Sequence, residues 1–263
     1  MDVNNLFSVK DKVVLITGGA KGVGLMISTA FVSAQAKVYI SSRDAAACQS
    51  ACATLNAIRP NSAFSLPADL QSEAEVKRLA AELTELEPNG IQVLINNSGA
   101  TWGEPYDTYP DAAWQKLLTL NLTRVFTLTQ ALTGLLVKGS KKGDPSRVVN
   151  IGSIDGLRVP LLPTFAYSAS KAGLHHLSRH MAVELGPRGV TVNNLACGPF
   201  PSKMMRHTLD TMGEVIKGAN PLGRVGEPED VGGACLFLCS RAGGYVNGAT
   251  LALDGGVSLM AKI

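Results

Sequence analysis

Tyr167 and Lys171 are the residues of this chain whose types and spacing point most directly to chemistry. They stand four apart in the segment 166–172, so on a helix they project from one face about one turn apart. A free phenol titrates near ~10 and must shift by about two to three units to exchange protons near neutral pH. A unit charge about 4 Å away, at an effective dielectric constant of about 20, supplies about 4 kcal/mol, which is enough. The pair therefore predicts a tyrosine acid or base, with two unrelated surface residues as the alternative.

The elements that must hold these side chains alternate between short apolar runs and longer helical stretches. Strands that alternate with helices indicate βαβ crossovers and a parallel sheet with helices on both faces. No segment resembles an interdomain linker or a repeat. We therefore expect an α/β fold, a single doubly wound Rossmann-type domain over residues 1–263 with a seven-stranded parallel sheet. The expected strands are Val13–Thr17, Lys37–Ser41, Ala63–Leu66, Val93–Asn96, Arg147–Ile151, Thr191–Leu195 and Thr250–Leu253.

The segment 199–227 breaks this alternation. It is a long stretch between the sixth expected strand and the next helix, it is rich in Met, and it contains three prolines. Long loops inside a compact domain commonly serve as lids or binding loops. The ligand crevice of such a sheet lies beyond the carboxyl ends of the strands, and this segment leaves from such an end. We expect it to be a substrate lid.

The bulk composition argues against several classes of function. The chain has 263 residues, 46% of them hydrophobic, and a net charge of only +3. This length allows a large core, and the charge excess is too small to suggest a nucleic-acid partner. No apolar run reaches the roughly 18 residues that span a bilayer, and the amino-terminal residues lack the pattern of a signal peptide. We expect a cytoplasmic protein with no membrane partner, although Ala261, Lys262 and Ile263 loosely resemble a peroxisomal address.

The five cysteines are the other compositional signal. Cys48 and Cys52, and likewise Cys235 and Cys239, are spaced as helical neighbours in apolar segments. No His or further Cys stands at ligand spacing, so we expect no metal site. Reduced and mostly buried thiols are the interpretation that fits.

A glycine-rich turn follows the first expected strand. Segment 17–24 reads TGGAKGVG and runs directly into a helical stretch. Such a turn lets backbone N–H groups approach a pyrophosphate at the positive end of the helix. The glycine order differs from the Gly-x-Gly-x-x-Gly fingerprint, and a merely tight turn is the alternative. The residues expected to hold the cofactor here are Gly18, Lys21, Gly22, Val23 and Gly24.

The end of the second strand bears on the choice of cofactor. NAD-binding sheets usually place an acid there to hold the ribose hydroxyls, but this chain has Ser42 followed by Arg43. Lys21 would approach from the glycine loop, and two cations without an acid suit a 2′-phosphate. We expect NADP(H) rather than NAD(H). The alternative is that Arg43 is an exposed loop charge paired with Asp44.

Residues after the third and fourth strands complete the expected nucleotide site. Asp69 and Leu70 are placed to contact the adenine. Asp69 could accept a hydrogen bond from the adenine amino group. Asn97 and Gly99 stand in the run 96–99, NNSG, beside the expected position of the nicotinamide-side ribose. Taken alone, an ordinary turn between strand and helix explains that run nearly as well.

Together these residues resemble the short-chain dehydrogenase/reductase family, over essentially the whole chain. The family's glycine loop matches segment 17–24, and its Asn-Asn-Ala-Gly motif appears as NNSG at 96–99. Its catalytic Asn, Ser, Tyr and Lys map to Asn121, Ser153, Tyr167 and Lys171. The resemblance implies carbonyl or alcohol chemistry with a nicotinamide cofactor. It also implies a homo-oligomer, commonly a tetramer built through the helices that carry Asn121 and Tyr167 and through the last strand.

The resemblance gives each of the four residues a role. Hydride reduction of a ketone leaves an alkoxide that must be protonated, and Tyr167 would donate that proton. Lys171 would lower the pKa of Tyr167 and hold the ribose hydroxyls. Ser153 would hydrogen-bond the carbonyl oxygen, and Asn121 would connect Lys171 to solvent through a water.

One departure from the family lies after the sixth strand. Cys197, Gly198 and Pro199 stand where the family usually has Pro-Gly. Gly198 can still supply the turn, so we expect Gly198, Pro199 and Phe200 to dock the nicotinamide. The reaction needs no thiol nucleophile, so none is expected of Cys197.

Within the family, segments 101–103 and 198–204 are most similar to 3-oxoacyl thioester reductases of the rhamnolipid-synthesis type. Phe200, Met204, Met205 and Met212 would offer an adaptable apolar surface to a lipophilic substrate, or else pack ordinarily on the sheet. The leading expectation is NADPH-dependent reduction of a 3-oxoacyl or polyketide-like carbonyl. One alternative is an oxidation-direction dehydrogenase for a steroid, sugar or other secondary alcohol. The other is a nucleotide-binding sensor without turnover.

Overall fold

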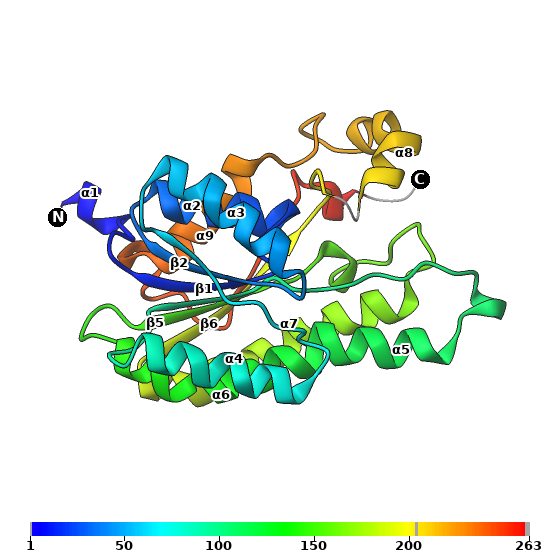
Figure 1. Cartoon of the computed structure of the whole chain (residues 1–263). Coiled ribbons are helices and arrows are strands. Elements are labelled where there is room, and N and C mark those ends of the chain that lie inside the picture. The colour runs from blue at the N-terminus through cyan, green and yellow to red at the C-terminus, as the bar shows by residue number, and fades with distance from the viewer. Residues whose placement is uncertain (1, 203–204, 261–263) are drawn as a thin grey trace.

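Seven parallel strands form one sheet in the order β3-β2-β1-β4-β5-β6-β7, which confirms the doubly wound α/β fold (Figure 1). The computed structural model describes residues 2–202 and 205–260. The strands are β1 (Val13–Thr17), β2 (Lys37–Ser41), β3 (Ala63–Ser65), β4 (Val93–Asn96), β5 (Ser146–Ile151), β6 (Val190–Cys197) and β7 (Thr250–Leu253). All seven lie where the sequence predicts them. The main difference is β6, which is longer at both ends than the expected run.

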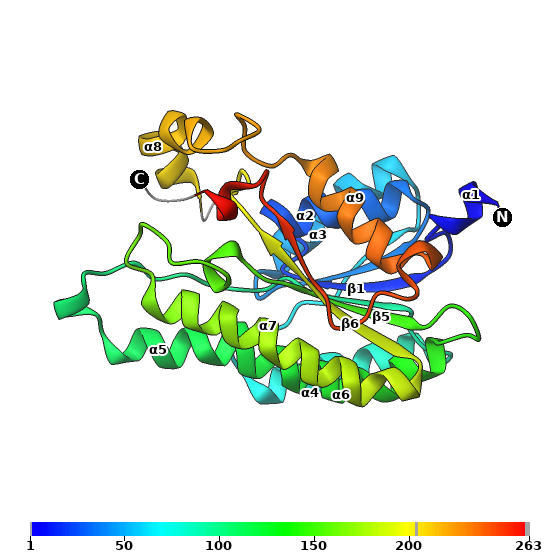
Figure 2. The same ribbon diagram turned by 180° about the vertical axis from the view of Figure 1, so that it is seen from behind.

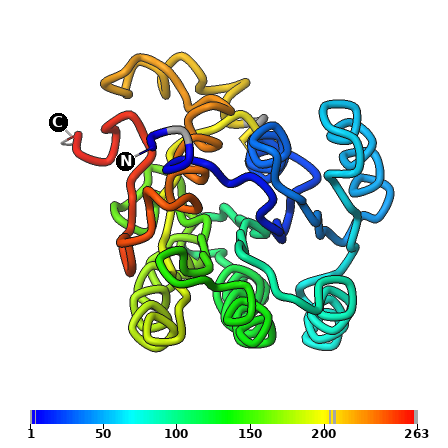
Figure 3. Tube along the Cα trace, turned by 90° about the vertical axis from the view of Figure 1, so that its left-hand side faces the viewer, coloured from blue at the N-terminus to red at the C-terminus, as the bar shows by residue number. Residues whose placement is uncertain are grey.

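Helices cover both faces of the sheet, and each helix layer has its own apolar core. Helices α2, α3 and α9 pack on one face, and α4, α6 and α7 pack on the other (Figures 1 and 2). In the end-on view of Figure 3, the second group forms a row beneath the sheet. The helices are α1 (Val3–Leu6), α2 (Gly22–Ser33), α3 (Ala45–Ile58), α4 (Glu73–Leu86), α5 (Asp111–Leu118), α6 (Arg124–Gly139), α7 (Phe165–Leu185), α8 (Arg206–Gly218) and α9 (Pro228–Cys239). Among the described helices, none combines the length and the apolar character needed to cross a bilayer.

A chain of buried polar side chains crosses the sheet just before its carboxyl edge. Asn96 of β4 donates to Asn150 of β5 at 2.8 Å, and Asn150 donates to the hydroxyl of Ser178 at 2.7 Å. Ser178, on α7, donates in turn to Asn194 of β6, which donates to Thr250 of β7. Buried polar groups of this kind need partners, and here each member supplies one to the next. The network fixes strands β4, β5, β6 and β7 and helix α7 relative to one another near the candidate site.

The segment 199–227 is not the open loop that the sequence suggests, because it contains helix α8. Figures 1 and 2 show α8 beyond the sheet, on the same side as α2 and α9. The two ends of the segment are tied together, since the N–H of Gly226 donates to the carbonyl of Pro199 at 2.9 Å. Lys203 and Met204 lie outside the described residues, as do Ala261, Lys262 and Ile263.

All five cysteines are free and buried, as the sequence predicts. Burial raises the pKa of Cys52 to about 11 and that of Cys197 to about 12. Neither thiol is therefore activated as a nucleophile at neutral pH.

Candidate active site

Ser153 lies two residues after the end of β5 and begins a short turn, Ile154–Gly156, that packs against α7. The N–H of Asp155 donates to the Ser153 hydroxyl at 3.1 Å, and Ser153 itself is buried. Two glycines permit the close approach to α7. A Cβ on Gly152 would lie 2.2 Å from Nε2 of His175, and one on Gly156 would lie 2.7 Å from the backbone nitrogen of Ala172. Larger residues at these positions would push the Ser153 turn away from the helix.

Tyr167 and Lys171 share one face of α7, as their spacing predicts. The Lys171 ammonium lies 5.7 Å from the centre of the Tyr167 ring and donates to the carbonyl of Ile151 at 2.7 Å. Ile151 is the last residue of β5, two positions before Ser153. The hydroxyl, the phenol and the ammonium therefore converge where β5 ends against α7.

Burial controls the acid–base properties of this pair. It raises the pKa of Tyr167 to about 12, against a lowering effect from the Ser153 hydrogen bond. It also lowers the pKa of Lys171 to about 8. The expected lowering of the Tyr167 pKa by Lys171 is thus not seen here, because loss of solvation on burial is the largest effect on the phenol. The phenol is protonated at neutral pH, which is the form that a proton donor requires.

Asn121 lies in a single π-helical turn, Thr119–Thr123, between α5 and α6. Such turns are frequent at functional sites. Its side chain is buried and makes a two-way pair with the backbone of Ala100, accepting from N–H and donating to C=O at 2.9 Å each. It also donates to the Ser170 hydroxyl at 3.0 Å. These contacts use both N–H donors of the amide and one acceptor site of its oxygen, so the water relay expected of Asn121 remains a prediction.

Gly99 separates Asn121 from Lys171. A Cβ on Gly99 would lie 3.3 Å from Oδ1 of Asn121 and 3.7 Å from Nζ of Lys171. The backbone at Gly99 therefore lies beside the Lys171 ammonium, where the sequence predicts the nicotinamide-side ribose.

The glycine turn is built as a phosphate cradle. Gly18 and Gly22 have positive φ angles of 65° and 54°, which glycine adopts without strain. A Cβ on Gly24 would lie 2.1 Å from the carbonyl oxygen of Gly18, so α2 rests directly on the turn. No side chain caps the first N–H groups of α2, at whose N-cap Lys21 stands exposed. Unsatisfied N–H groups at a helix start are what an anion binds.

Thr17 and Asn97 hold this cradle, a role that the sequence did not reveal. The Thr17 hydroxyl accepts from the N–H groups of Asn97 and Ser98, each at 3.0 Å. The amide of Asn97 donates to the carbonyls of Thr17 and Gly18 at 3.0 and 3.2 Å. Asn97, expected to bind the cofactor, thus has its side-chain N–H₂ group committed to joining the loops after β1 and β4. Val23 packs half-buried against the core.

The Arg43 guanidinium extends into solvent next to Ser42. The alternative of an Arg43–Asp44 ion pair is not found among the described residues. Asp44 instead caps α3 by accepting from the N–H of Ala47 at 3.0 Å, and the Ser42 hydroxyl meets Cys48 at 3.2 Å. Both cations near this corner, Lys21 and Arg43, are therefore exposed to an incoming anion.

The other residues predicted to contact the nucleotide follow β3 and β6, at the same carboxyl edge of the sheet. After β3, Asp69 is exposed and accepts from the N–H of Gln71 at 3.1 Å, while Leu70 is buried. After β6, the N–H of Gly198 donates to the carbonyl of Leu253 at 2.9 Å. A Cβ on Gly198 would lie 2.9 Å from Cα of Asp254, so the turn at Gly198 requires glycine.

Phe200 is a core residue, so at this position the alternative of ordinary packing holds rather than an adaptable surface. It is 3% exposed, and a Cβ on Gly226 would lie 2.3 Å from its ring. The ring anchors the base of segment 199–227 because a fully packed aromatic side chain has a large buried area. Met205 and Met212 are half-exposed and stay compatible with a substrate surface.

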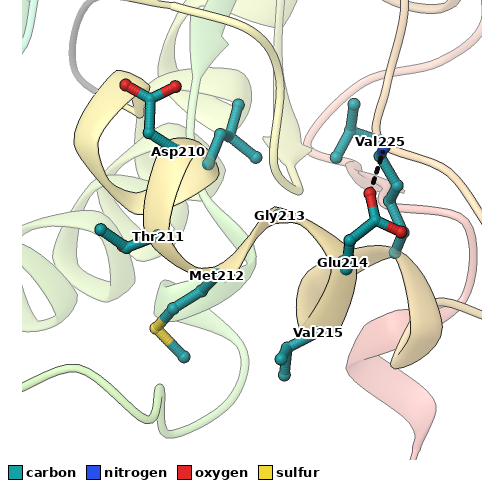
Figure 4. A pocket seen from close by; sticks show the side chains of 9 residues that line it. Asp210, Thr211, Met212, Gly213, Glu214, Val215 and Val225 are labelled. Carbon is teal, nitrogen blue, oxygen red and sulfur yellow. Dashed lines mark hydrogen bonds and ion pairs between the residues drawn. The ribbon is translucent and has the colours of Figure 1, made fainter.

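A pocket of about 370 Å³ opens beside α8 (Figure 4). Met212, Val215 and Val225 contribute its apolar lining, and Glu214 pairs with Lys217 at its edge at 2.8 Å. None of the four candidate catalytic residues lies in this lining within the described part of the chain. The pocket therefore belongs to the segment that flanks the site rather than to the reacting centre.

A glycine cradle, a buried serine and lysine with a half-buried tyrosine, and a π-turn asparagine meet at one sheet edge, which agrees with the comparison with known families. A family model described as enoyl-(acyl carrier protein) reductase matches residues 18–258. The chain belongs to the short-chain dehydrogenase/reductase family. As a member, it is an oxidoreductase that acts on CH–OH and C=O groups with a nicotinamide cofactor.

Similar proteins cover nearly the full length of this short-chain dehydrogenase/reductase. The rhamnolipids biosynthesis 3-oxoacyl-[acyl-carrier-protein] reductase of Pseudomonas aeruginosa is 40% identical over 255 residues, 96% of this chain and 98% of that protein. The galactitol 2-dehydrogenase (L-tagatose-forming) of Cereibacter sphaeroides is 34% identical over 98% of this chain and 100% of its own length. Among solved structures, the Pseudomonas aeruginosa RhlG/NADP active-site complex superposes with a TM-score of 0.93 at 39% identity, covering 97% of this chain and 99% of that one.

Proposed function

We propose that this enzyme is an NADPH-dependent reductase that transfers hydride to a ketone of a 3-oxoacyl thioester or polyketide-like substrate and yields a secondary alcohol. The observation that carries the proposal is the convergence of Ser153, Tyr167 and Lys171 at the end of β5. The 40% identical relative named as a 3-oxoacyl-[acyl-carrier-protein] reductase supports this substrate class.

The geometry fits a nicotinamide dinucleotide phosphate. The positive-φ turn at Gly18 and Gly22 and the uncapped start of α2 would receive the pyrophosphate. Lys21 and Arg43 would hold the 2′-phosphate, and the complex of the similar solved structure with NADP is consistent with this assignment. Asp69 and Leu70 would line the adenine, and Gly99 and Gly198 with Pro199 would flank the nicotinamide end.

Each catalytic side chain then has a defined task. When bound, the nicotinamide supplies the hydride, while the protein supplies position and charge. Ser153 donates a hydrogen bond to the carbonyl oxygen and fixes its orientation. Tyr167, held protonated by burial, donates its proton to that oxygen as the alkoxide forms. Lys171, anchored on Ile151, holds the ribose and stabilises the phenolate left behind.

The surroundings suit a lipophilic substrate. The loop between Ser153 and α7 exposes apolar side chains, with Leu161 80% exposed, and Tyr106 and Phe165 meet edge to face nearby with ring centres 5.7 Å apart. We infer that segment 199–227 acts as a lid opposite this apolar loop. The buried Phe200 ring anchors the start of this segment, and α8 would contact an acyl chain.

A second candidate is the oxidation of a sugar-like secondary alcohol, which the relative named galactitol 2-dehydrogenase favours. The same Ser, Tyr and Lys can serve either direction, because proton transfer is reversible. The exposed cations Lys21 and Arg43 favour reduction, since they suit NADPH.

The test is NADPH consumption with a short 3-oxoacyl thioester, with NADH and galactitol plus NADP⁺ in parallel. Wild-type turnover with NADPH should fall by roughly 10²- to 10⁴-fold in Tyr167→Phe, while NADPH binding measured by fluorescence stays unchanged.

Arg43→Ala should weaken NADPH binding by roughly tenfold or more and leave NADH binding alone, because only NADPH carries the 2′-phosphate. NADPH binding without turnover on any ketone would support a sensor instead. Failure to bind either cofactor would refute the proposal.

We also propose that the enzyme assembles as a homotetramer. Apolar side chains are exposed on the elements that the family uses for assembly: Phe126 on α6, Val183 on α7 and Leu251 on the edge strand β7. A parallel sheet normally has both faces covered, yet β7 is only half-buried. Light scattering coupled to size-exclusion chromatography should give four times 27.6 kDa; a monomer would rule the tetramer out.

A further inference from the structure

Asp155 is an acidic side chain beside the reacting atoms that the mechanism above does not use. It stands two residues after Ser153, and its N–H holds the Ser153 hydroxyl at 3.1 Å. The turn that carries it cannot shift away, because Gly156 lies tight against the backbone of α7. Any carbonyl oxygen bound by Ser153 and Tyr167 must therefore lie close to Asp155.

The Asp155 carboxylate makes no direct ion pair in the described structure, and the charge of Arg158 acts on it only at longer range. It is half-buried, yet no hydrogen bond or ion pair engages it within residues 2–202 and 205–260. The Arg158 guanidinium donates to the carbonyl of Val257 at 3.2 Å and is held on the carboxyl-terminal turn. The charge of Asp155 raises the pKa of Tyr167, which places the carboxylate within electrostatic reach of the phenol. Burial raises the pKa of Asp155 itself, against a lowering effect from the charge of Arg158.

We propose that Asp155 is a specificity-determining residue that excludes ketones bearing a free carboxylate, so that the enzyme accepts a 3-oxoacyl group only as a neutral derivative such as a thioester, ester or amide. A 3-oxo acid places its carboxylate two carbons from the reacting carbonyl, and thus beside Asp155. Two like charges in a partly desolvated site repel more strongly than in water. A thioester or amide has the same 3-oxo frame without that charge. The inference rests on the proposed ketone reduction and names the substrate class that the site admits.

The test compares 3-oxooctanoate with 3-oxooctanamide, which have the same carbon skeleton and differ in charge. The wild-type enzyme should prefer the amide by at least tenfold in kcat/KM, which corresponds to about 1.4 kcal/mol. Asp155→Asn keeps the shape and removes the charge, so it should reduce this preference by about tenfold. Asp155→Glu keeps the charge and should keep the preference, which guards against an effect of altered packing. Asp111→Asn, which removes an exposed acid on α5, is the matched control and should change nothing.

A 3-oxoacyl thioester serves as the common reference in every variant. If the wild-type enzyme does not reduce the thioester, the proposed function itself fails. If it reduces the thioester but treats the acid and the amide alike, whether both react or neither does, the role of Asp155 is overturned. The same holds if Asp155→Asn reduces the thioester and leaves the preference intact.

Discussion

At the residue scale, His175 takes no part in the reaction but affects the pH range in which the fold around the site is stable. Its ring is buried one turn beyond Lys171 and lies between Gly152 and Gly156, which flank the Ser153 turn. Neither ring nitrogen has a hydrogen-bond partner in the described structure. Burial, with smaller contributions from Lys171 and Arg179, lowers the pKa of His175 to about 4. The ring is thus a neutral spacer between the serine turn and α7.

This burial predicts acid sensitivity. Because the folded-state pKa lies below the unfolded value of about 6.5, the unfolded chain binds the extra proton first. The stabilisation is complete above about pH 6.5 and is lost as the pH falls toward about 4, at a cost on the order of 3 kcal/mol. Urea unfolding across this range should show the slope in wild type and lose most of it in His175→Leu. His180→Leu, on the exposed side of the same helix, should keep the slope; an unchanged slope in His175→Leu would contradict the assignment.

The residues also show where prediction from sequence reaches its limit. Tyr167, Lys171, Ser153 and the glycine turn could be recognised because their chemistry depends on local spacing or on a short motif. His175 and Thr17 could not, because their roles arise from contacts with distant segments that only folding brings together. The predicted lowering of the Tyr167 pKa was wrong for the same reason. Burial raises this pKa, and burial is a property of the packed molecule.

At the element scale, segment 199–227 is a helix on a rigid base rather than a loop. We expect Gly226→Ala to disturb that base, because a Cβ there would lie 2.3 Å from the Phe200 ring. Overpacking of this kind typically costs about 1–3 kcal/mol. It should lower the unfolding free energy in urea and expose the segment to limited proteolysis.

Gly213→Ala is the matched control for this substitution. Gly213 lies within α8, and a Cβ there would meet nothing within 4 Å. Replacing a helical glycine by alanine should stabilise α8 by roughly 0.5–1 kcal/mol. Equal effects of the two substitutions would mean that Phe200 does not anchor the segment. The strands were predictable because their apolar runs are continuous, whereas α8 was not, since the methionines and prolines of segment 199–227 suggested a loop.

At the scale of the whole molecule, one carboxylate ties together parts of the chain that are far apart in sequence. Asp144 accepts from Lys12 and from the fully buried Arg147, each at 2.9 Å. Arg147 also donates to the carbonyls of Leu238 and Ser240 at 3.2 and 2.9 Å, so the cluster joins the approach to β1, strand β5 and the end of α9. Burial lowers the pKa of Lys12 and that of Arg147, and Asp144 opposes both effects.

Removing that carboxylate should destabilise the fold as a unit. Asp144→Asn leaves two buried cations without an anion, and losing one member of a buried ion pair costs about 3–5 kcal/mol. A change of 1 kcal/mol shifts the Tm of a domain this large by about 2–4 °C, so calorimetry should show a fall of roughly 6–20 °C. Glu214→Gln breaks the exposed pair with Lys217 and should leave the Tm almost unchanged. A small effect of Asp144→Asn would show that the cluster is dispensable.

The burial of all five thiols makes the native surface unreactive toward maleimides and other thiol-directed labels. A single cysteine introduced as Val215→Cys, at a position on α8 that is 63% exposed, would then be the only site to take up a fluorophore. Its emission would report directly whether α8 moves when NADPH and substrate are added. The enzyme can thus be observed during turnover with every natural cysteine left in place.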